Sequence, residues 1–289
     1  MIAVDWGTSS LRAFRLDADG GVLERRSSAL GILHVPGGDF AAVLRDQVGD
    51  WLAAGESEVL LSGMVGSRQG WVEAPYLPCP AGPLEIEAAL VPVPFDGARV
   101  RLVPGLSDRD EADVPEVMRG EETQLLGVMD AMDGEGLACL PGSHSKWAAI
   151  EGGRIASFRT YMSGEAFSAL RAGTILGRMM VDGPPDAGAF AEGVARSGAG
   201  GHLLHHLFGV RTRGLFGTLA DTASVSYLSG LLIGHEIRAA LPADGDVALI
   251  GAASLTALYA SAIAACGGKP RIMDEDAAAR GLARIAGVG

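Results

Sequence analysis

The sequence predicts an α/β protein built of two similar halves. Two stretches, one beginning at residue 2 and the other near residue 137, share the same order of segments: a hydrophobic strand, a turn of small residues, a return strand and a hairpin. Later in the chain, a buried strand at residues 247–251 leads into an Ala-rich helical segment that ends near Gly267. This mixture of strands and helices is typical of the α/β class.

The amino-acid composition limits the kinds of protein and of partner that we expect. The chain has 289 residues, of which 48% are hydrophobic and 20% charged, so it can bury a sizeable core. Its formal net charge of −12 excludes nucleic acid as a bulk partner. The uncharged stretch at residues 247–268 is rich in Ala and Ser, which insert weakly into membranes, so we expect no membrane span.

The spacing of the cysteines and the N-terminal sequence predict the cellular compartment of the protein. Cys79, Cys139 and Cys266 lie too far apart for a disulfide framework or a CxxC metal site. The first ten residues contain no basic region and no long apolar run of a secretory signal. We therefore expect a cytoplasmic protein.

The positions of apolar residues, Gly and Pro predict individual strands, helices and turns. Residues 2–28 alternate apolar and polar positions around Gly-rich turns and predict a meander of three strands. We also expect a helix over 40–52, a buried strand running into a Gly-rich loop over 58–66, and an irregular Pro-rich segment over 75–83. The polar segment at 108–116 is the expected boundary, which gives domains at 1–115 and 116–289.

Asp5 and the turn after it are the first candidate site. Glycine lets a backbone approach a phosphate, while hydroxyls and N–H groups donate to it. A carboxylate at the end of the first strand can hold Mg²⁺ through water. An ordinary hairpin is the alternative. The predicted phosphate contacts are Gly7, Thr8, Ser9 and Ser10.

A second small-residue turn occupies the matching place in the other half. Its members are Gly142, Ser143, His144, Ser145 and Lys146. Two hydroxyls and a cation suit a polyphosphate. The alternative of a serine nucleophile is disfavoured because the chain has no G-x-S-x-G elbow.

A third element is the strand end at Gly251 and Ala252, where a backbone can lie against a flat adenine ring. The order of turn, turn and strand–Gly–helix resembles the phosphate-1, phosphate-2 and adenosine motifs of the actin, Hsp70 and sugar-kinase superfamily. The third motif often has Gly-Gly in that superfamily, whereas this chain has Gly-Ala.

Glu121 and Glu122 begin a predicted helix about 20 residues before the second turn. Sugar kinases of this superfamily place at this relative position the carboxylate that removes the proton from the attacking hydroxyl. The helix N-terminus would keep such a carboxylate ionised. A capping role is the alternative, and Glu121 is preferred only slightly over Glu122.

The Gly-rich segment after the second buried strand suits a small polar ligand. Arg68 can grip a carboxylate with two parallel hydrogen bonds, while Ser67 and Gln69 can read hydroxyls. Trp71 and Tyr76 are either ligand contacts or core anchors. The HLLHH run at residues 202–206 lacks metal-ligand geometry and is expected on a helix surface or at an interface.

Eight segments together resemble the 2-dehydro-3-deoxygalactonokinase family. They run in order from residue 4 to about residue 236: DWGTSSLR, GMVGSRQGWVEAPY, CPAG, VPGL, VMRGEETQLLG, LPGSHSKWA, YMSGEAF and YLSGLLIGHE. The longer segments are very specific. Ser143 and Ser163 stand where Thr is expected, and both keep the hydroxyl.

The resemblance implies two actin-like (ribonuclease H-like) domains with an ATP cleft between them. It also implies phosphorylation of 2-dehydro-3-deoxy-D-galactonate by Mg²⁺-ATP at the C6 hydroxyl, in galactonate breakdown. The carboxylate of the sugar acid would lie on Arg68 and its C6 hydroxyl near Glu121. A kinase of the same fold for another sugar, or a non-catalytic ATP-dependent sensor, remains an alternative. Galacto versus gluco preference and a homo-oligomeric state stay open.

Overall fold

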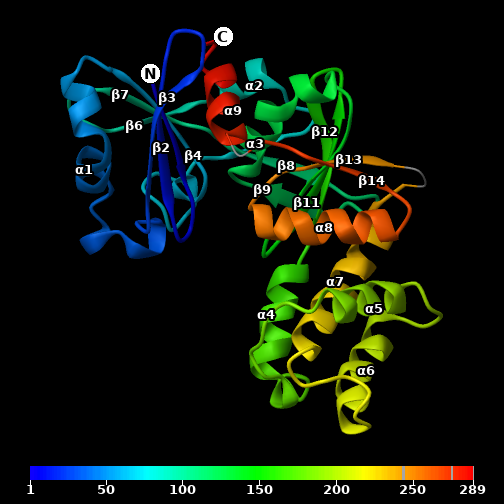
Figure 1. Cartoon of the computed structure of the whole chain (residues 1–289). Coiled ribbons are helices and arrows are strands. Elements are labelled where there is room, and N and C mark those ends of the chain that lie inside the picture. Colours follow the sequence, from blue (N-terminus) through cyan, green and yellow to red (C-terminus); the bar gives the residue numbers. More distant parts are fainter. Residues whose placement is uncertain (243–244, 275, 289) are drawn as a thin grey trace. The chain divides into compact units, whose positions relative to one another are not determined.

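The structure is a computed structural model that describes residues 1–242, 245–274 and 276–288. Within these residues the strands form sheets of six, five and three strands, accompanied by helices (Figure 1). The predicted α/β class is therefore confirmed. No helix in the described part of the chain combines the length and the apolar character that a membrane span needs.

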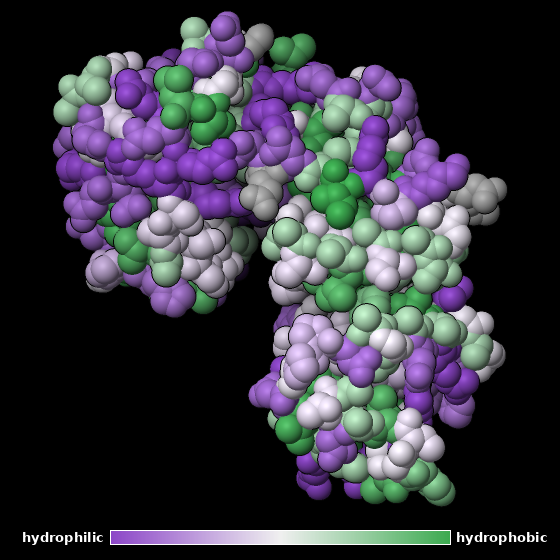
Figure 2. Space-filling view, in the orientation of Figure 1, coloured by the Kyte–Doolittle hydropathy of each residue, from purple (hydrophilic) through white to green (hydrophobic). Residues whose placement is uncertain are grey.

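The six-stranded sheet contains the predicted meander. Its strand order is β3-β2-β1-β4-β7-β6. The strands are β1 (Ile2–Trp6), β2 (Leu11–Leu16), β3 (Val22–Ser28), β4 (Glu58–Ser62), β6 (Val91–Val93) and β7 (Arg99–Leu102). β1 pairs antiparallel with β2 and parallel with β4. The edge strand β3 is mostly polar and poorly buried, and Figure 2 shows hydrophilic residues across much of this part.

Helix α1 (Phe40–Ala53) supplies the helical face of the first core. The Asp39 side chain accepts a hydrogen bond from the Ala42 N–H (2.9 Å) and so caps the helix. The apolar positions recur at helical spacing and are buried. They are Phe40, Val43, Leu44, Val48 and Trp51. They pack with side chains of β1, β2 and β4, which confirms the predicted helix at 40–52.

A three-stranded sheet follows, with the order β5-β8-β9. Its strands are β5 (Tyr76–Pro78), β8 (Gly105–Arg109) and β9 (Pro115–Met118). β5 corrects our expectation of a wholly irregular segment at 75–83; an edge strand tolerates Pro78 because that side of the strand need not donate. The polar segment at 108–116 forms the end of the β8–β9 hairpin.

The remaining helices near these two sheets are short. They are α2 (Pro83–Ala88), α3 (Glu121–Val128) and α9 (Ala277–Ile285). α3 and α9 pack very closely, since a Cβ added to Gly127 or Gly281 would overlap backbone of the other helix. The last helix of the chain therefore supports the helix that begins with Glu121.

The five-stranded sheet has the order β12-β11-β10-β13-β14. Its strands are β10 (Gly136–Leu140), β11 (Ser145–Glu151), β12 (Arg154–Tyr161), β13 (Asp246–Leu249) and β14 (Lys269–Ile272). The helices of this region are α4 (Ser163–Gly173), α5 (Ala187–Ser197), α6 (Leu203–Leu215), α7 (Ser224–Ala240) and α8 (Ala253–Ala265). β13 and α8 confirm the predicted strand and Ala-rich helix.

The chain forms two compact units. Unit 1 contains Met1–Gly136, Ala148–Arg159 and Asp274–Gly289, and unit 2 contains Leu137–Trp147 and Thr160–Met273. Neither unit follows a single cut of the sequence, because the chain returns to unit 1 twice. The actin-like division at 115/116 stays a prediction.

Candidate functional site

The first small-residue turn lies directly after β1 in unit 1. The Gly7 N–H donates to the Ser10 carbonyl at 2.9 Å, which closes the turn. Thr8, Ser9 and Ser10 are exposed, so their hydroxyls are available to a ligand. Gly31 packs so closely beneath the turn that an added Cβ would overlap Ser9 and Ser10 backbone.

Asp5 stands at the end of β1, opposite Arg12 of β2. The two side chains form an ion pair through Asp5 Oδ2. The other oxygen, Oδ1, faces Gly63, at 3.3 Å from the position of an added Cβ. A single carboxylate with one engaged oxygen fits the few protein ligands that Mg²⁺ takes, with phosphates and waters filling the other positions. The described residues contain no cluster of three or more His, Cys, Asp and Glu suited to a metal.

Two glycines bring the start of α3 close to β1. Gly63 follows β4 at a φ of 95°, and an added Cβ would lie 2.8 Å from the Trp6 carbonyl oxygen. Gly120 precedes α3 at a φ of 106°, and its added Cβ would lie 3.2 Å from the Gly63 Cα. Only glycine adopts such φ values without strain. The sequence Gly120-Glu121 is therefore placed beside the strand end that carries Asp5.

Glu121 and Glu122 occupy different environments although they are adjacent. Glu121 is partly exposed, and its Oε2 accepts a hydrogen bond from the Arg119 N–H at 3.0 Å. Glu122 is fully buried and accepts from the Gly120 N–H at 2.7 Å. The Ser62 hydroxyl also donates to Glu122 at 3.5 Å.

Burial controls the ionisation of Glu122. It raises the pKa of this carboxyl to about 8, and the neighbouring Glu121 charge adds to the rise. The backbone N–H donors and the Arg119 charge act in the opposite direction and are outweighed. Glu122 is thus largely protonated at neutral pH and has no access to solvent.

The Gly-rich segment at residues 63–76 divides its side chains between surface and core. Arg68 and Gln69 are exposed, and Arg68 forms an ion pair with Glu73 at 3.4 Å. Trp71 is stacked on Phe40 with ring centroids 6.2 Å apart. Its place in this aromatic cluster indicates that the Trp71 ring anchors the segment to the core.

Tyr76 is exposed, but one face of its ring is covered by the buried guanidinium of Arg119. The sequence analysis did not identify Arg119 as a site residue. The Arg119 guanidinium lies over the Tyr76 ring at 4.4 Å and donates to the Ala74 carbonyl at 2.7 Å. Arg119 is only 8% exposed. Its position directly before Gly120-Glu121 in VMRGEE was the one available signal.

The second small-residue turn lies in unit 2 after β10, and its last two residues, Ser145 and Lys146, are the first residues of β11. Ser143 and His144 are exposed, whereas Ser145 and Lys146 are buried. The start of α4 supports the turn: the Glu165 N–H donates to the Ser143 carbonyl at 3.0 Å, and the Glu165 carboxylate pairs with His144. An added Cβ at Gly164 would overlap the Gly142 carbonyl.

A buried network that the sequence analysis also missed joins this turn to α7 and α8. The Glu236 carboxylate accepts from Trp147 Nε1 and from the Tyr259 hydroxyl, both at 2.8 Å, and Tyr259 also bonds with the Ser145 hydroxyl at 2.8 Å. Ser163 at the start of α4 bonds with Glu236 as well, and burial raises the Glu236 pKa. An isolated acid in the apolar α7 sequence was the signal.

Gly251 and Ala252 end β13 and lead into α8, as predicted. Gly251 has a φ of 143°, and the nearest backbone to its added Cβ is the Pro141 carbonyl at 3.7 Å. Ala252 is exposed and precedes α8. The strand end at Gly251 therefore lies beside the beginning of the second turn, inside unit 2.

The predicted residues fall into two groups. Unit 1 holds Asp5, the first turn, the two glutamates and the segment at 67–76; unit 2 holds the second turn and Gly251-Ala252. Ser67, Arg68, Gln69 and Tyr76 lie on the same segment as Trp71, and this segment meets the start of α3 through Arg119.

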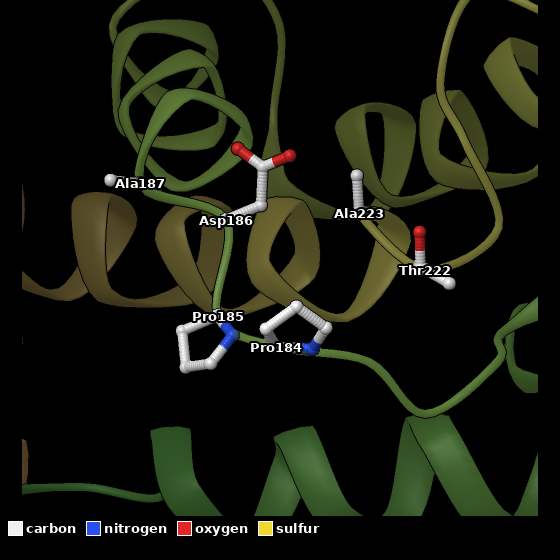
Figure 3. Close-up of a pocket in the computed structure, with 6 residues that line it drawn as sticks. All are labelled: Pro184, Pro185, Asp186, Ala187, Thr222 and Ala223. Carbon is white, nitrogen blue, oxygen red and sulfur yellow. The ribbon is translucent and has the colours of Figure 1, made fainter.

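One pocket lies away from all of these residues. It has a volume of about 300 Å³ and is lined by Pro184, Pro185, Asp186, Ala187, Thr222 and Ala223 (Figure 3). Asp186 caps α5 by accepting from the Ala189 N–H at 2.9 Å, so one of its carboxylate oxygens is engaged in the helix cap. The pocket contains none of the predicted site residues.

The HLLHH run differs from the expected surface position at one residue. His206 is fully buried, and its Nδ1 lies 3.0 Å from His235 Nε2. Its other ring nitrogen lies 3.2 Å from the Gly200 carbonyl. His206 is thus a hydrogen-bonded core residue.

Known proteins of one family resemble this chain over most of its length. Residues 5–285 match the family model described as 2-keto-3-deoxy-galactonokinase. The chain is 38% identical over 286 residues to DgoK1 of Rhizobium meliloti strain 1021, across 96% of this chain and 93% of the relative. It is 37% identical over 269 residues to 2-dehydro-3-deoxygalactonokinase of Escherichia coli K12, across 92% and 90% of the two chains.

Solved structures show the same fold. A Sinorhizobium meliloti protein of the 2-dehydro-3-deoxygalactonokinase type has a TM-score of 0.89 and 36% identity, covering 99% of this chain and 97% of that chain. The activator of the 2-hydroxyisocaproyl-CoA dehydratase of Clostridium difficile has a TM-score of 0.54 at 11% identity, covering 100% and 95%, and shows the fold alone. The predicted actin-like fold class is confirmed. The family match extends over nearly the whole sequence, and the chain belongs to the 2-keto-3-deoxy-galactonokinase family.

Proposed function

We propose that this kinase transfers the terminal phosphoryl group of ATP to the C6 hydroxyl of 2-dehydro-3-deoxy-D-galactonate, giving the 6-phosphate and ADP. The relatives that share more than a third of its sequence carry this substrate in their names. The observation that carries the proposal is the cluster in unit 1 where Gly120-Glu121 meets Gly63 beside Asp5. A carboxylate and an exposed hydroxyl-rich turn then lie close to one strand end.

Glu121 is the general base in this proposal. A base must reach the hydroxyl and be ionised, and Glu121 is partly exposed at a helix start, where the dipole favours a negative charge. Glu122 meets neither requirement, since it is sealed from solvent and its pKa is raised to about 8. Glu122 instead holds the Gly120 N–H and keeps the turn in shape.

Three segments of the sequence are proposed to bind the nucleotide. Its phosphates would be bound by the turn at 7–10 and by the turn at 142–146, and its adenosine by Gly251-Ala252. Asp5 would hold Mg²⁺, which neutralises charge on the transferred phosphoryl group. The protein's part in phosphoryl transfer is then positioning and charge stabilisation by backbone N–H groups, hydroxyls and Lys146.

The sugar acid is proposed to bind the segment that contains Ser67, Arg68, Gln69, Trp71 and Tyr76, which the structure joins to the start of α3. We further propose the cytoplasm as its compartment, in keeping with three free cysteines. A homo-oligomeric state also remains a proposal.

Two functions compete with this one. A kinase of the same fold for another sugar would turn over a neutral substrate equally well. A non-catalytic ATP-dependent protein is the second candidate, because the dehydratase activator with bound ADPNP shares the fold.

ATP consumption with Mg²⁺ against a panel of sugars and 2-keto-3-deoxy sugar acids separates these functions. We expect product only with the keto-deoxy acids, fastest with the galacto form. Turnover of neutral sugars at the same rate would favour the second kinase. ATP binding without any acceptor would favour the non-catalytic protein.

Adjacent isosteric variants test the base. We expect Glu121→Gln to lower kcat by roughly 10²- to 10⁴-fold while ATP still binds. Glu122→Gln is the matched control, because Gln keeps an acceptor for the Gly120 N–H, and it should retain most activity. Near-normal rates in both variants would show that neither carboxyl is the base.

A further inference from the structure

The buried Arg119 guanidinium has donors left over. Its Nη2 donates to the Ala74 carbonyl at 2.7 Å, and its face lies over the Tyr76 ring. Its Nε and Nη1 are buried and have no hydrogen-bond partner in the part of the chain that the structure describes. The Ser67 hydroxyl is also buried and has no hydrogen-bond partner among those residues.

Such donors are costly without an acceptor. A buried cation and its N–H groups lose their hydration, and only an acceptor or a counter-charge restores it. A guanidinium presents its N–H groups in a planar fork that matches a carboxylate. The unpaired donors of Arg119 and Ser67 therefore suit an anionic ligand.

The Arg119 donors adjoin the segment to which the ligand of the proposed reaction would bind. Gly66 has no side chain at the point where a Cβ would lie 3.1 Å from Arg119 Nη1, and Ser67 follows Gly66 directly. On the other side, the backbone N–H of Arg119 donates to Glu121. One residue thus connects the predicted sugar-acid segment to the proposed base.

We propose that Arg119, with Ser67, receives the carboxylate of the sugar acid, and that Arg68 does not. This inference rests on the proposed function. Arg68 has an 87% exposed side chain and already pairs with Glu73, so it offers a solvated charge with little directional constraint. Arg119 offers a positive charge that is shielded from water and is held in place by the Ala74 carbonyl and the Tyr76 ring.

Access to these donors requires a movement. Because the unpaired atoms of Arg119 and Ser67 are closed to solvent, the acid reaches them only when the segment at 67–76 shifts. Arg68 and Gln69 of this segment are exposed. The acid alone, without ATP, should therefore change backbone hydrogen exchange over residues 67–76.

Paired variants and paired substrates test the proposal. Arg119→Gln loses the charge but keeps an amide that can donate to the Ala74 carbonyl, and Arg68→Gln is the control. Each is assayed with the sugar acid and with its methyl ester, which lacks the charge but keeps the hydroxyls. We expect Arg119→Gln to raise KM for the acid about 10- to 100-fold and to change KM for the ester little. Arg68→Gln should change KM for the acid and for the ester by the same factor, because it removes no contact with the carboxylate.

The outcomes separate the two proposals. A wild type that phosphorylates no keto-deoxy acid overturns the proposed function. A wild type that does so, while Arg119→Gln keeps its preference for acid over ester, overturns this inference, as does a selective loss in Arg68→Gln. Equal losses with acid and ester would make Arg119 a structural clamp only.

Two measurements check that the Arg119→Gln variant is folded. ADP binding and the thermal unfolding midpoint should match the wild type in Arg119→Gln. If that variant does not fold, Arg119→Lys and hydrogen exchange in the wild type replace it. Exchange over 67–76 that changes with the acid and not with the ester supports the proposal, and exchange that the acid leaves unchanged contradicts it.

Discussion

The two glutamates at the start of α3 show that adjacent side chains can differ strongly in burial and in hydrogen bonding. Glu121 and Glu122 are chemically identical and adjacent, so the sequence offered no strong reason to choose between them. The choice depends on distant residues: Ser62 donates to the buried Glu122, and Gly63 lies against Gly120, directly before the partly exposed Glu121. Such contacts come from distant parts of the chain and leave no local pattern.

Burial of Glu122 makes a prediction about pH and stability. Its pKa of about 8 in the folded protein lies above its ordinary value near 4.5. Between these values the folded state binds a proton that the unfolded state has released, so stability falls as pH rises. Glu122→Gln removes this proton, and its thermal unfolding midpoint should decline less than that of the wild type between pH 5 and pH 8.

The size and control of this effect follow from the linkage. One proton contributes at most about 1.4 kcal/mol per pH unit. Glu121→Gln is the comparison: it leaves the buried carboxyl in place and removes the neighbouring charge that adds to the rise of its pKa, so the pH dependence should weaken without being lost. Identical pH dependence in the wild type and in Glu122→Gln would show that Glu122 does not hold the proton.

At the scale of elements, turns were easier to predict than what supports them. The turns at 7–10 and 142–146 could be recognised because small residues between two hydrophobic runs are a local signal. The supports could not, because Gly31 and Gly164 lie elsewhere in sequence and act by close backbone approach. A glycine required by a neighbour has the same appearance in the sequence as a glycine in a loose turn.

Helix α4 offers a matched pair of glycines to test this support. Gly164 packs against Gly142 and Ser143, whereas an added Cβ at Gly173 meets nothing within 4 Å. Gly164→Ala should displace the second turn and raise KM for ATP about 10-fold or more, because a displaced donor loses its phosphate contact. Gly173→Ala should leave KM unchanged and stabilise the helix by up to about 1 kcal/mol. Unchanged KM in both variants would contradict a role of α4 in nucleotide binding.

At the scale of the whole molecule, the class and the order of motifs were predictable, but the composition of the compact units was not. Strand and helix patterning indicated two similar halves, since each half carries its own local signals. The return of α9 to unit 1 depends on contacts between helices about 150 residues apart. Arg280 Nε donates to the Gly127 carbonyl at 3.0 Å, and Arg284 pairs with Asp130 at 2.6 Å.

From this packing we predict that α9 influences kinase activity. Gly281 of α9 lies so close to α3 that an added Cβ would overlap the Thr123 carbonyl, two residues after Glu121. Gly281→Ala should lower the stability of unit 1 by about 1–3 kcal/mol through overpacking and reduce kcat by displacing Glu121. Gly209→Ala in α6 is the control, because its added Cβ meets nothing within 4 Å. Thermal unfolding and ATP turnover of both variants measure this. Equal behaviour of the two would mean that α3 does not depend on α9, and the position of Glu121 would then need another support.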